Sequence, residues 1–433
     1  MSTPRHLSVF SGIGICAASM IGSGIFTVTG FIGPSLGTNA NVLLAWLLGG
    51  LLSLAGALTV AELAANRPVP GALYVAARET LGPRLGFVNG VVTVLVGYIA
   101  AAAFIASVLG TYVASLVPGL PPMLTALLLV GALTALHGRW LRSGARINDA
   151  MAALKVVVLL AFAIAGLLVT PADPIDAPAI ATPPAAWSAA VGAAVVSISF
   201  AYLGWSAAAD VAGELKRPAR SIPMSIVSSV VLVTGLYLLV NVAYLRAVTP
   251  QAMVDPESGE PMADIGAVAS TALFGSAIGT VMTLAIIAIL LSTLSTMLFT
   301  GGRVLVSMAR QGEAPAMLER AGPHGAPAAA TWAQALLIIP FIVLPTLGGL
   351  LEYIGLLITF AASMSGFAVL VRRARGEPRV WSMPAHPVPV AVFLLLSGWL
   401  AASAAIDTPM TAVYSGGTLL LIILLRPVLA RQG

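Results

Sequence analysis

The chain has 433 residues, of which 59% are hydrophobic and 9% are charged, and its formal net charge is +5. Ordinary soluble domains carry charge on about a quarter of their residues, so this composition excludes that class and predicts a multispanning membrane protein. The single cysteine, Cys16, excludes an intrachain disulfide, and the four histidines lack the spacing of metal ligands. We expect one membrane domain over residues 1–433, with no metal and no cofactor.

Apolar stretches of about 20 residues predict transmembrane helices, because that length crosses the hydrocarbon core of a bilayer. Twelve such stretches predict an all-α polytopic protein in the lipid bilayer. The first is longer than a signal-peptide core, so we expect it to stay in the protein as a span. The predicted spans are residues 8–33, 40–66, 86–116, 121–137, 146–169, 186–215, 221–245, 265–305, 327–349, 350–371, 386–406 and 409–427.

Basic residues predict the orientation, because Lys and Arg in short loops stay on the cytoplasmic side. Most of the 21 Lys and Arg residues fall in the termini and in alternate loops, and the remaining loops carry mainly acids. Both termini are therefore predicted to be cytoplasmic, in the cell inner membrane. The positive charge follows this topology, so nucleic acid is not expected as a partner. Examples are Arg67, Lys216 and Arg372 in the basic loops, and Asp173, Asp255 and Asp264 in the acidic loops.

Two predicted spans contain helix-breaking sequence. Gly-Ser-Gly at residues 22–24 interrupts the first span, although each glycine costs about 1 kcal/mol of helix propensity. Phe-Ala-Tyr-Leu-Gly-Trp at residues 200–205 interrupts the sixth span, which crosses in the opposite direction. Matching breaks divide the first ten spans into inverted halves, residues 8–169 and 186–371, as in secondary transporters. The last two spans, residues 386–427, lie outside these halves and could form a homodimer surface.

Two of the charged residues inside predicted spans are candidates for a function. Lys155 is in the fifth span, where a lysine costs roughly 3 kcal/mol to insert, so we expect it to face the protein interior and to have a function. The alternative is that it snorkels, or holds helices together by binding a carbonyl. Asp210 lies in the inner half of the sixth span, where Lys155 or an aqueous vestibule would satisfy it. Both residues are candidates for ion coupling.

Four sequence motifs resemble the amino acid–polyamine–organocation (APC) superfamily of permeases. They are Gly-Ser-Gly-Ile-Phe at 22–26, Ala-Glu-Leu at 61–63 with Gly-Ala-Leu-Tyr at 71–74, Phe-Ala-Tyr-Leu-Gly-Trp with residues 211–223, and Phe-Thr-Gly-Gly-Arg at 299–303 with Met-Ala-Arg-Gln-Gly at 308–312. The chain looks nearest to prokaryotic relatives of the L-type neutral amino acid transporters. The resemblance implies a LeuT-type fold, in which helices one and six of a five-plus-five inverted repeat are broken.

The resemblance also implies how an amino acid would be held. The substrate carboxylate would meet backbone N–H groups at the start of a half-helix, which are free donors at the positive end of a helix dipole. These are the amides of Ser23, Gly24 and Ile25. The α-ammonium would meet backbone carbonyls freed by the breaks, those of Ile21, Phe200, Ala201 and Leu203.

Further roles are implied for single side chains. Phe200 matches an aromatic gate over the substrate, whereas Trp205 is either a second gate residue or ordinary packing. Tyr237 matches a tyrosine near the inner side of the site, although it could equally be interhelical packing.

Lys155 matches the place where sodium-coupled members of the fold bind a cation, so its ammonium would replace the ion. The implied partners are Gly22 and a hydroxyl of Ser292 or Ser295, although helix hydroxyls often bond their own preceding turn. A charged Lys155 would be a fixed tie and a neutral one a proton carrier, and the sequence leaves both open.

These observations predict a sodium-independent secondary transporter of amino acids that works by alternating access, as a proton symporter or as an exchanger. No acid lies beside either break, which favours neutral substrates. One alternative is a cationic amino acid or polyamine exchanger, for which Asp210 would supply the acid. Another is a membrane sensor that binds an amino acid without moving it. An enzyme is not expected, because the sequence has no nucleophile–base pair and no phosphate-binding loop.

Overall fold

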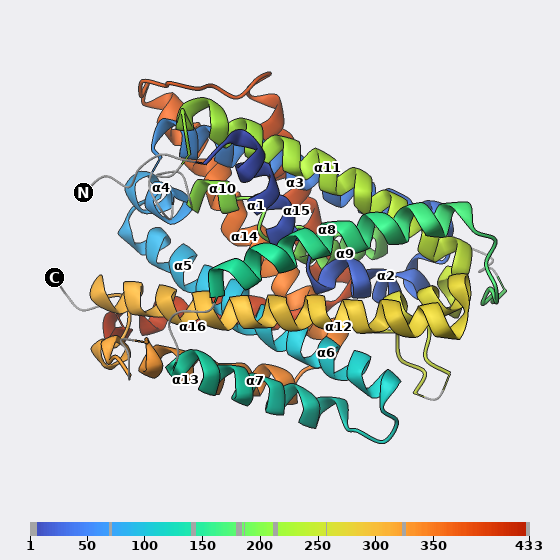
Figure 1. Cartoon of the computed structure of the whole chain (residues 1–433). Helices are drawn as coiled ribbons and strands as arrows, with labels where there is room; N and C mark the ends of the chain where they lie inside the picture. Colours follow the sequence, from blue (N-terminus) through green and yellow to red (C-terminus); the bar gives the residue numbers. More distant parts are fainter. Residues whose placement is uncertain are drawn as a thin grey trace.

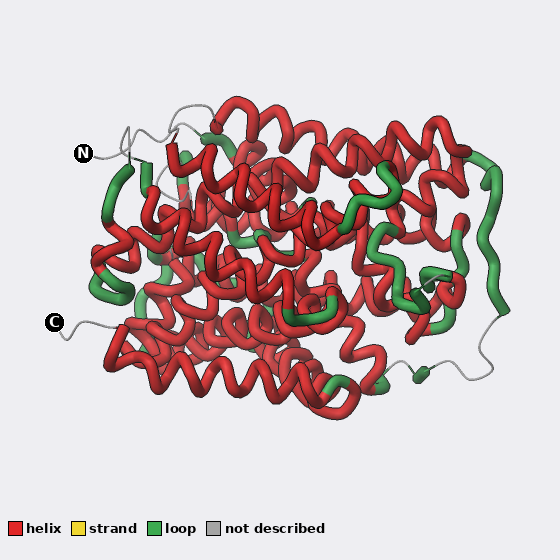
Figure 2. Tube along the Cα trace, turned by 90° about the horizontal axis from the view of Figure 1, so that it is seen from below, coloured by secondary structure: helices red, strands yellow, loops and turns green. Residues whose placement is uncertain are grey.

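The computed structural model of the chain is a bundle of long helices (Figure 1). It describes residues 7–68, 72–139, 144–178, 184–185, 187–210, 215–256, 258–322 and 326–429. Within these ranges there is no strand, and only isolated bridges such as Leu7 to Leu215 occur. Figure 2 shows that most of the chain is helix and that the long helices run lengthwise. The all-α prediction is therefore confirmed.

The elements follow the predicted spans closely. In the first part of the chain they are α1 Val9–Met20, α2 Ser23–Leu36, α3 Asn39–Asn66, α4 Ala72–Leu81, α5 Pro83–Val94, the π-helical segment η1 Leu95–Ala100, α6 Ala101–Leu116, α7 Pro122–Arg139 and α8 Gly144–Leu168. In the second part they are α9 Ala189–Ala201, α10 Ala207–Asp210, α11 Pro218–Ala247, η2 Pro250–Ala252, α12 Ile265–Arg310, η3 Ala316–Glu319, α13 Ala328–Val343, α14 Leu347–Ala374, α15 Val388–Asp407 and α16 Pro409–Leu429.

The helices are long and apolar enough for a polytopic membrane protein. Among the described residues, seven helices meet the length and hydropathy of a membrane span, and the bent pair α1 and α2 makes an eighth. Shorter apolar helices accompany them, namely Pro122–Gly138, Leu154–Leu168, Ala189–Ala201 and Ala328–Val343. Large apolar side chains such as Leu128, Val157 and Leu395 lie exposed on the outside of the bundle, where lipid would cover them.

The first span is broken where the glycines predict. Helix α1 ends at Met20, and α2 begins at Ser23 with its axis turned by 43°. Between them Ile21 is extended, and Gly22 has φ −137° and ψ −149°, outside the helical region. The backbone is non-helical for these two residues. They lie in the interior of the protein, and a membrane tolerates non-helical backbone only in such a place.

The sixth span is broken as well. Helix α9 ends at Ala201, and turns lead to the short helix α10. Gly204 in these turns has φ +105°, a conformation that side-chain-bearing residues rarely adopt. A glycine is therefore needed here for the backbone to turn.

The two breaks lie against each other, with α2 beside α9 near the centre of the bundle (Figure 1). A Cβ placed on Gly24 would lie 2.5 Å from both the Cα and the Cβ of Ala201. A Cβ placed on Gly204 would lie 2.8 Å from Ser19, which is in the last turn of α1. Each break therefore uses a glycine to let its backbone touch the other broken span.

Three boundaries differ from the sequence prediction. The eighth predicted span is one helix, α12, but Gly275 inside it has φ +78° and kinks it. The break between the ninth and tenth predicted spans falls after Val343, several residues before the predicted position. A π-helical segment, Leu95–Ala100, lies within the third span. Apolar patterning does not mark such points, because the residues on both sides of each are equally apolar.

The contact at Gly24 predicts a matched pair of variants. Gly24→Ala should lower the stability of the protein by about 1–3 kcal/mol, because the added methyl overlaps the backbone of Ala201. Gly14→Ala in α1 has open space around the new methyl and should be neutral, or stabilising by up to about 1 kcal/mol. Thermal unfolding of both variants in detergent measures the difference, and equal melting temperatures would show that the close contact does not constrain the fold.

Candidate functional site

The first turn of α2 offers backbone donors in a buried place. A helix start leaves its first N–H groups without intrahelical acceptors, and the N-cap residue Gly22 has no side chain to accept from them. Among the described residues, the amides of Ser23, Gly24 and Ile25 donate no hydrogen bond, and all three residues are buried. Such amides at the positive end of a helix dipole can bind a carboxylate.

Carbonyl groups lie at the ends of the two breaks. The carbonyl of Phe200 already accepts from the amides of Tyr202 and of Leu203, the latter at 3.0 Å, and that of Ala201 accepts from the Tyr237 hydroxyl. The carbonyls of Ile21 and Leu203 accept no hydrogen bond within the described part of the chain. Because a carbonyl oxygen has two lone pairs, those of Ile21, Ala201 and Leu203 retain capacity for an ammonium, whereas that of Phe200 would have to give up a bond to its own turn.

Tyr237 links the two broken spans. Its hydroxyl lies 2.9 Å from the carbonyl oxygen of Met20, at the end of α1, and 3.0 Å from that of Ala201, at the end of α9. The side chain is fully buried, and its ring packs at 5.3 Å from those of both Trp46 and Tyr202. The hydroxyl thus holds the ends of α1 and α9 together from α11.

A chain of buried polar groups continues from Tyr237, and the sequence analysis did not identify it. The Asn241 amide donates to the Tyr237 carbonyl at 2.7 Å, and the Thr29 hydroxyl donates to Asn241. The Trp46 indole N–H donates to the same Thr29 hydroxyl at 3.1 Å. The only signal in the sequence was the spacing of Tyr237 and Asn241, which places both residues on one face of a helix.

Phe200 and Trp205, the predicted gate residues, have different surroundings. The Phe200 ring is 5% exposed and packs edge-to-face against Phe104 of α6, with the ring centroids 4.9 Å apart. Phe104 in turn lies 6.4 Å from Phe31 of α2. Trp205 is half-buried in the turns between α9 and α10 and packs against the main core.

Lys155 lies in α8, which packs against α1, α11 and α12. Its side chain is 7% exposed and makes no hydrogen bond or ion pair with the described residues. The side chain of Asp210, its predicted alternative partner, lies outside the described part of the chain.

The predicted partners of Lys155 each have neighbours that the structure identifies. Thr293 of α12 is beside the first break, since a Cβ placed on Gly22 would lie 3.7 Å from its methyl group. The Ser295 hydroxyl instead lies 2.9 Å from Nε2 of His137 in α7, and the Ser292 carbonyl accepts from the Thr296 hydroxyl of its own helix. Within the described ranges, no hydrogen bond joins Lys155 to Gly22, Ser292 or Ser295. Thr293 was missed because sequence spacing alone does not set the rotation of α12.

A family model described as amino acid permease matches residues 7–425 of the chain, which is nearly its whole length. The chain belongs to the amino acid permease family.

The alignments with curated relatives of this permease cover most of both chains. The serine/threonine exchanger SteT of Bacillus subtilis (strain 168) is 27% identical over 394 residues, covering 88% of this chain and 87% of the relative. The branched-chain amino acid permease BcaP of the same organism is 27% identical over 443 residues, covering 92% and 89%. The human large neutral amino acids transporter small subunit 2 is 28% identical over 416 residues, covering 90% and 72%.

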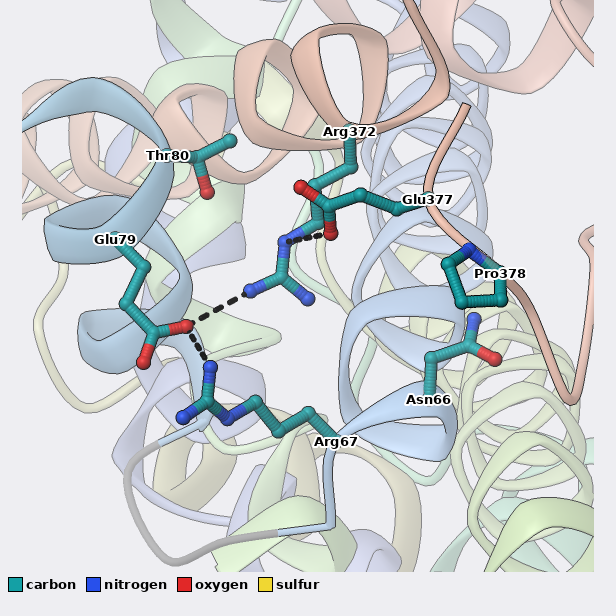
Figure 3. Close-up of a pocket in the computed structure, with 7 residues that line it drawn as sticks. All are labelled: Asn66, Arg67, Glu79, Thr80, Arg372, Glu377 and Pro378. Carbon is teal, nitrogen blue, oxygen red and sulfur yellow. Dashed lines mark hydrogen bonds and ion pairs between the residues drawn. The ribbon is translucent and has the colours of Figure 1, made fainter. Parts of the chain in front are cut away.

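Charged residues gather at the end of the bundle where α3, α4 and α14 meet, around a cavity of about 270 Å³ (Figure 3). Arg372 lies between Glu79, at 3.2 Å, and Glu377, at 3.7 Å, and Arg67 pairs with Glu79 from the opposite side. The arginines and glutamates of this cavity balance in charge, so it has no bias toward an anionic or cationic ligand.

Next to this cavity, Glu62 forms a salt bridge with Arg373. Its carboxylate accepts two hydrogen bonds from Arg373, at 2.8 and 2.5 Å, and one from the Met383 amide at 2.8 Å. Glu62 is 4% exposed, so its charge depends on these donors. The pair ties α3 to α14 at the end of the bundle opposite the acidic loops.

Tyr237→Phe tests the link between the broken spans. The carbonyls of Met20 and Ala201 share the single proton of this hydroxyl, so removing it leaves them without that donor, and we expect a stability loss of about 1–3 kcal/mol. Tyr353→Phe is the control, because Tyr353 is only partly buried and its hydroxyl bonds the Thr418 hydroxyl at 2.9 Å, a group that can rotate to another partner. Unfolding curves in detergent measure both, and a wild-type melting temperature for Tyr237→Phe would contradict the link.

Arg373→Ala tests the buried ion pair. We expect a stability loss of about 3–5 kcal/mol, because the variant leaves the Glu62 carboxylate buried and unpaired. Arg67→Ala removes one partner of an exposed pair, whose side chains are 51% and 35% accessible, and should cost no more than about 1 kcal/mol. The same unfolding measurement compares them, and equal losses would show that the Glu62 pair is no more important than a surface pair.

Proposed function

We propose that this chain is a sodium-independent secondary transporter of neutral amino acids that works by alternating access at the crossing of its two broken spans. The observation that carries the proposal is the buried contact between the start of α2, whose first amides have no acceptor among the described residues, and the end of α9, where the sixth span breaks. An amino acid zwitterion needs donors for its carboxylate and acceptors for its ammonium, and this crossing supplies both. Transport would proceed as proton symport or as exchange.

The helices support a twelve-span architecture with an inverted repeat. The spans long enough to cross a bilayer and the shorter apolar helices together correspond to the twelve predicted stretches. The break between α1 and α2 opens the first half, and the break between α9 and α10 opens the second. The distribution of basic residues supports cytoplasmic termini in the inner membrane.

Neutral substrates fit the surroundings of the breaks. The described side chains there are small, aromatic or hydroxyl-bearing, as at Ser23, Ile25, Phe200 and Tyr237. The relatives are named for serine and threonine, branched-chain and large neutral amino acids, all of which have uncharged side chains. A cationic substrate would need an acid at this place.

Lys155 is the proposed coupling residue. A buried lysine that has no partner among the described residues is costly in a membrane, and it supplies a positive charge or a proton inside the bundle without a bound metal ion. It could hold its neighbours electrostatically as a fixed charge, or carry a proton in each transport cycle. Sodium independence follows in either case, because the ammonium replaces the bound cation.

Uptake of radiolabelled neutral amino acids into liposomes tests the proposal, with sodium, pH gradient and internal amino acid varied separately. We expect uptake without sodium that responds to the pH gradient or to internal amino acid. Lys155→Ala should reduce the initial rate at least tenfold, because the bundle loses its buried charge. Lys216→Ala is the matched control, since that lysine is exposed, and it should transport normally.

Each part of the proposal has an outcome that contradicts it. A requirement for sodium would exclude the role given to Lys155. Uptake of arginine, lysine or polyamines without uptake of any neutral amino acid would replace the substrate class. Binding of an amino acid without uptake would indicate a sensor.

A further inference from the structure

Two buried hydroxyl groups on α2 have no hydrogen-bond partner among the described residues. They are Ser23 Oγ and Thr27 Oγ1, and their side chains are 1% and 0% exposed. Buried polar groups in folded proteins are nearly always paired, so an unpaired one needs an explanation, for example a ligand. Other unpaired hydroxyls, such as those of Thr134 and Ser415, lie on different helices. Ser23 and Thr27 are one helical turn apart, next to the proposed carboxylate site.

A bond to its own helix is the commonest way in which a buried hydroxyl is satisfied in this protein. Many buried hydroxyls donate to the carbonyl four residues earlier, and Thr27 does not. Those that do are Thr59, Thr80, Thr125, Ser199, Ser270, Thr283, Thr293, Thr331, Thr359 and Ser397. The Thr27 hydroxyl is therefore available to another molecule, although the common intrahelical bond was open to it.

The neighbours of α2 indicate which way the side chains of Ser23 and Thr27 point. Residues four apart share a face of a helix, so Ser23, Thr27 and Phe31 point the same way. The Phe31 ring lies 6.4 Å from Phe104 of α6, and Gly30 faces Ile265 at the start of α12. The face therefore looks between α6 and α12, on the flank of α2 next to its contact with α9.

Distance along α2 limits the ligand. Side chains on a helix tilt toward its N-terminus, so the Thr27 hydroxyl leans back over the first turn, where the free amides are. One turn is about 5.4 Å, which a hydroxyl on the β-carbon of an amino acid can reach while its carboxylate binds those amides. The packed rings of Phe104 and Phe200 close the neighbouring side, so only a short side chain fits.

We propose that Ser23 and Thr27 form a subsite that hydrogen-bonds a hydroxyl on the β-carbon of the substrate. The permease then prefers small β-hydroxy amino acids, L-serine and L-threonine, over apolar isosteres such as L-valine. This inference rests on the proposed transport function. A site with polar groups that only the correct substrate can pair discriminates strongly against the analogue that lacks the hydroxyl.

The test compares uptake of L-threonine and L-valine, which differ by a hydroxyl in place of a methyl, by the full-length protein in liposomes. Wild type should favour threonine. Thr27→Val should lower the uptake efficiency for threonine roughly tenfold, the equivalent of one hydrogen bond, and leave valine unchanged or improved. Thr27→Ser restores a hydroxyl and should keep the preference. Thr59→Val, whose hydroxyl bonds Ala55 of its own helix, should leave both rates unchanged.

Thermal unfolding shows whether the variants fold. Thr27→Val should melt at or above the wild-type temperature, because it removes an unpaired polar group, whereas Thr59→Val should melt lower. Addition of L-threonine should raise the melting temperature of wild type more than that of Thr27→Val.

The remaining outcomes separate the subsite from the transport function. Equal uptake of threonine and valine by wild type would overturn the subsite and leave the transport proposal standing. An equal loss for both substrates in Thr27→Val would also overturn it, because the hydroxyl would then serve the carboxylate or the fold. Absence of uptake of any amino acid by wild type would overturn the transport proposal, and the subsite with it.

Discussion

The close contact between Gly24 and Ala201 is the constraint on which the rest of the centre depends. The start of α2 and the end of α9 lie so near that a methyl on Gly24 would be 2.5 Å from the backbone of Ala201. The glycine at this position allows the two broken spans to approach each other. The breaks leave amides and carbonyls in the protein interior, and the Tyr237 hydroxyl lies within hydrogen-bond distance of two of those carbonyls. The site proposed for a zwitterion depends on how the two broken helices meet.

Polar groups are scarce in this chain, so the way each is satisfied is informative. Many buried hydroxyls bond their own helix, and the longer polar side chains cross between helices, as Asn241 does to Thr29 and Gln334 does to the carbonyls of Tyr98 and Met297. At the start of α2, the hydroxyls of Ser23 and Thr27 and the amides of the first turn form a cluster of groups that lack partners among the described residues. Leaving a buried polar group unpaired costs about 1–3 kcal/mol, so such a cluster is stable only because the surrounding helices hold it in place.

Much of the helical architecture could be predicted from the sequence, because apolar length and the cost of glycine in a helix are local properties. The break at residues 22–24 and the turn at Gly204 follow from them. The resemblance to the permease superfamily added the expectation that Tyr237 lies near the inner side of the site. Contacts between helices could not be predicted in the same way: Thr293 lies beside Gly22, and Asn241 reaches Thr29. These pairings depend on how each helix is rotated about its axis, which apolar residues on all sides leave undetermined.

The polar ties between helices fall into two groups, and the proposed site lies where the groups meet. One group joins the broken spans to α3 and α11, through Trp46, Thr29, Asn241 and Tyr237. The other joins α7, α12, α13 and the third span, through the contact of His137 with Ser295 and the bonds of Gln334. The Tyr112 hydroxyl, which donates to the Phe26 carbonyl at 2.7 Å, crosses between them. Helices that meet through apolar side chains slide past each other more easily than helices joined by hydrogen bonds come apart. An apolar side chain that leaves one neighbour packs equally well against the next. Movement of the two groups against each other would therefore preserve most of the polar ties and open the space between Thr27 and Phe104.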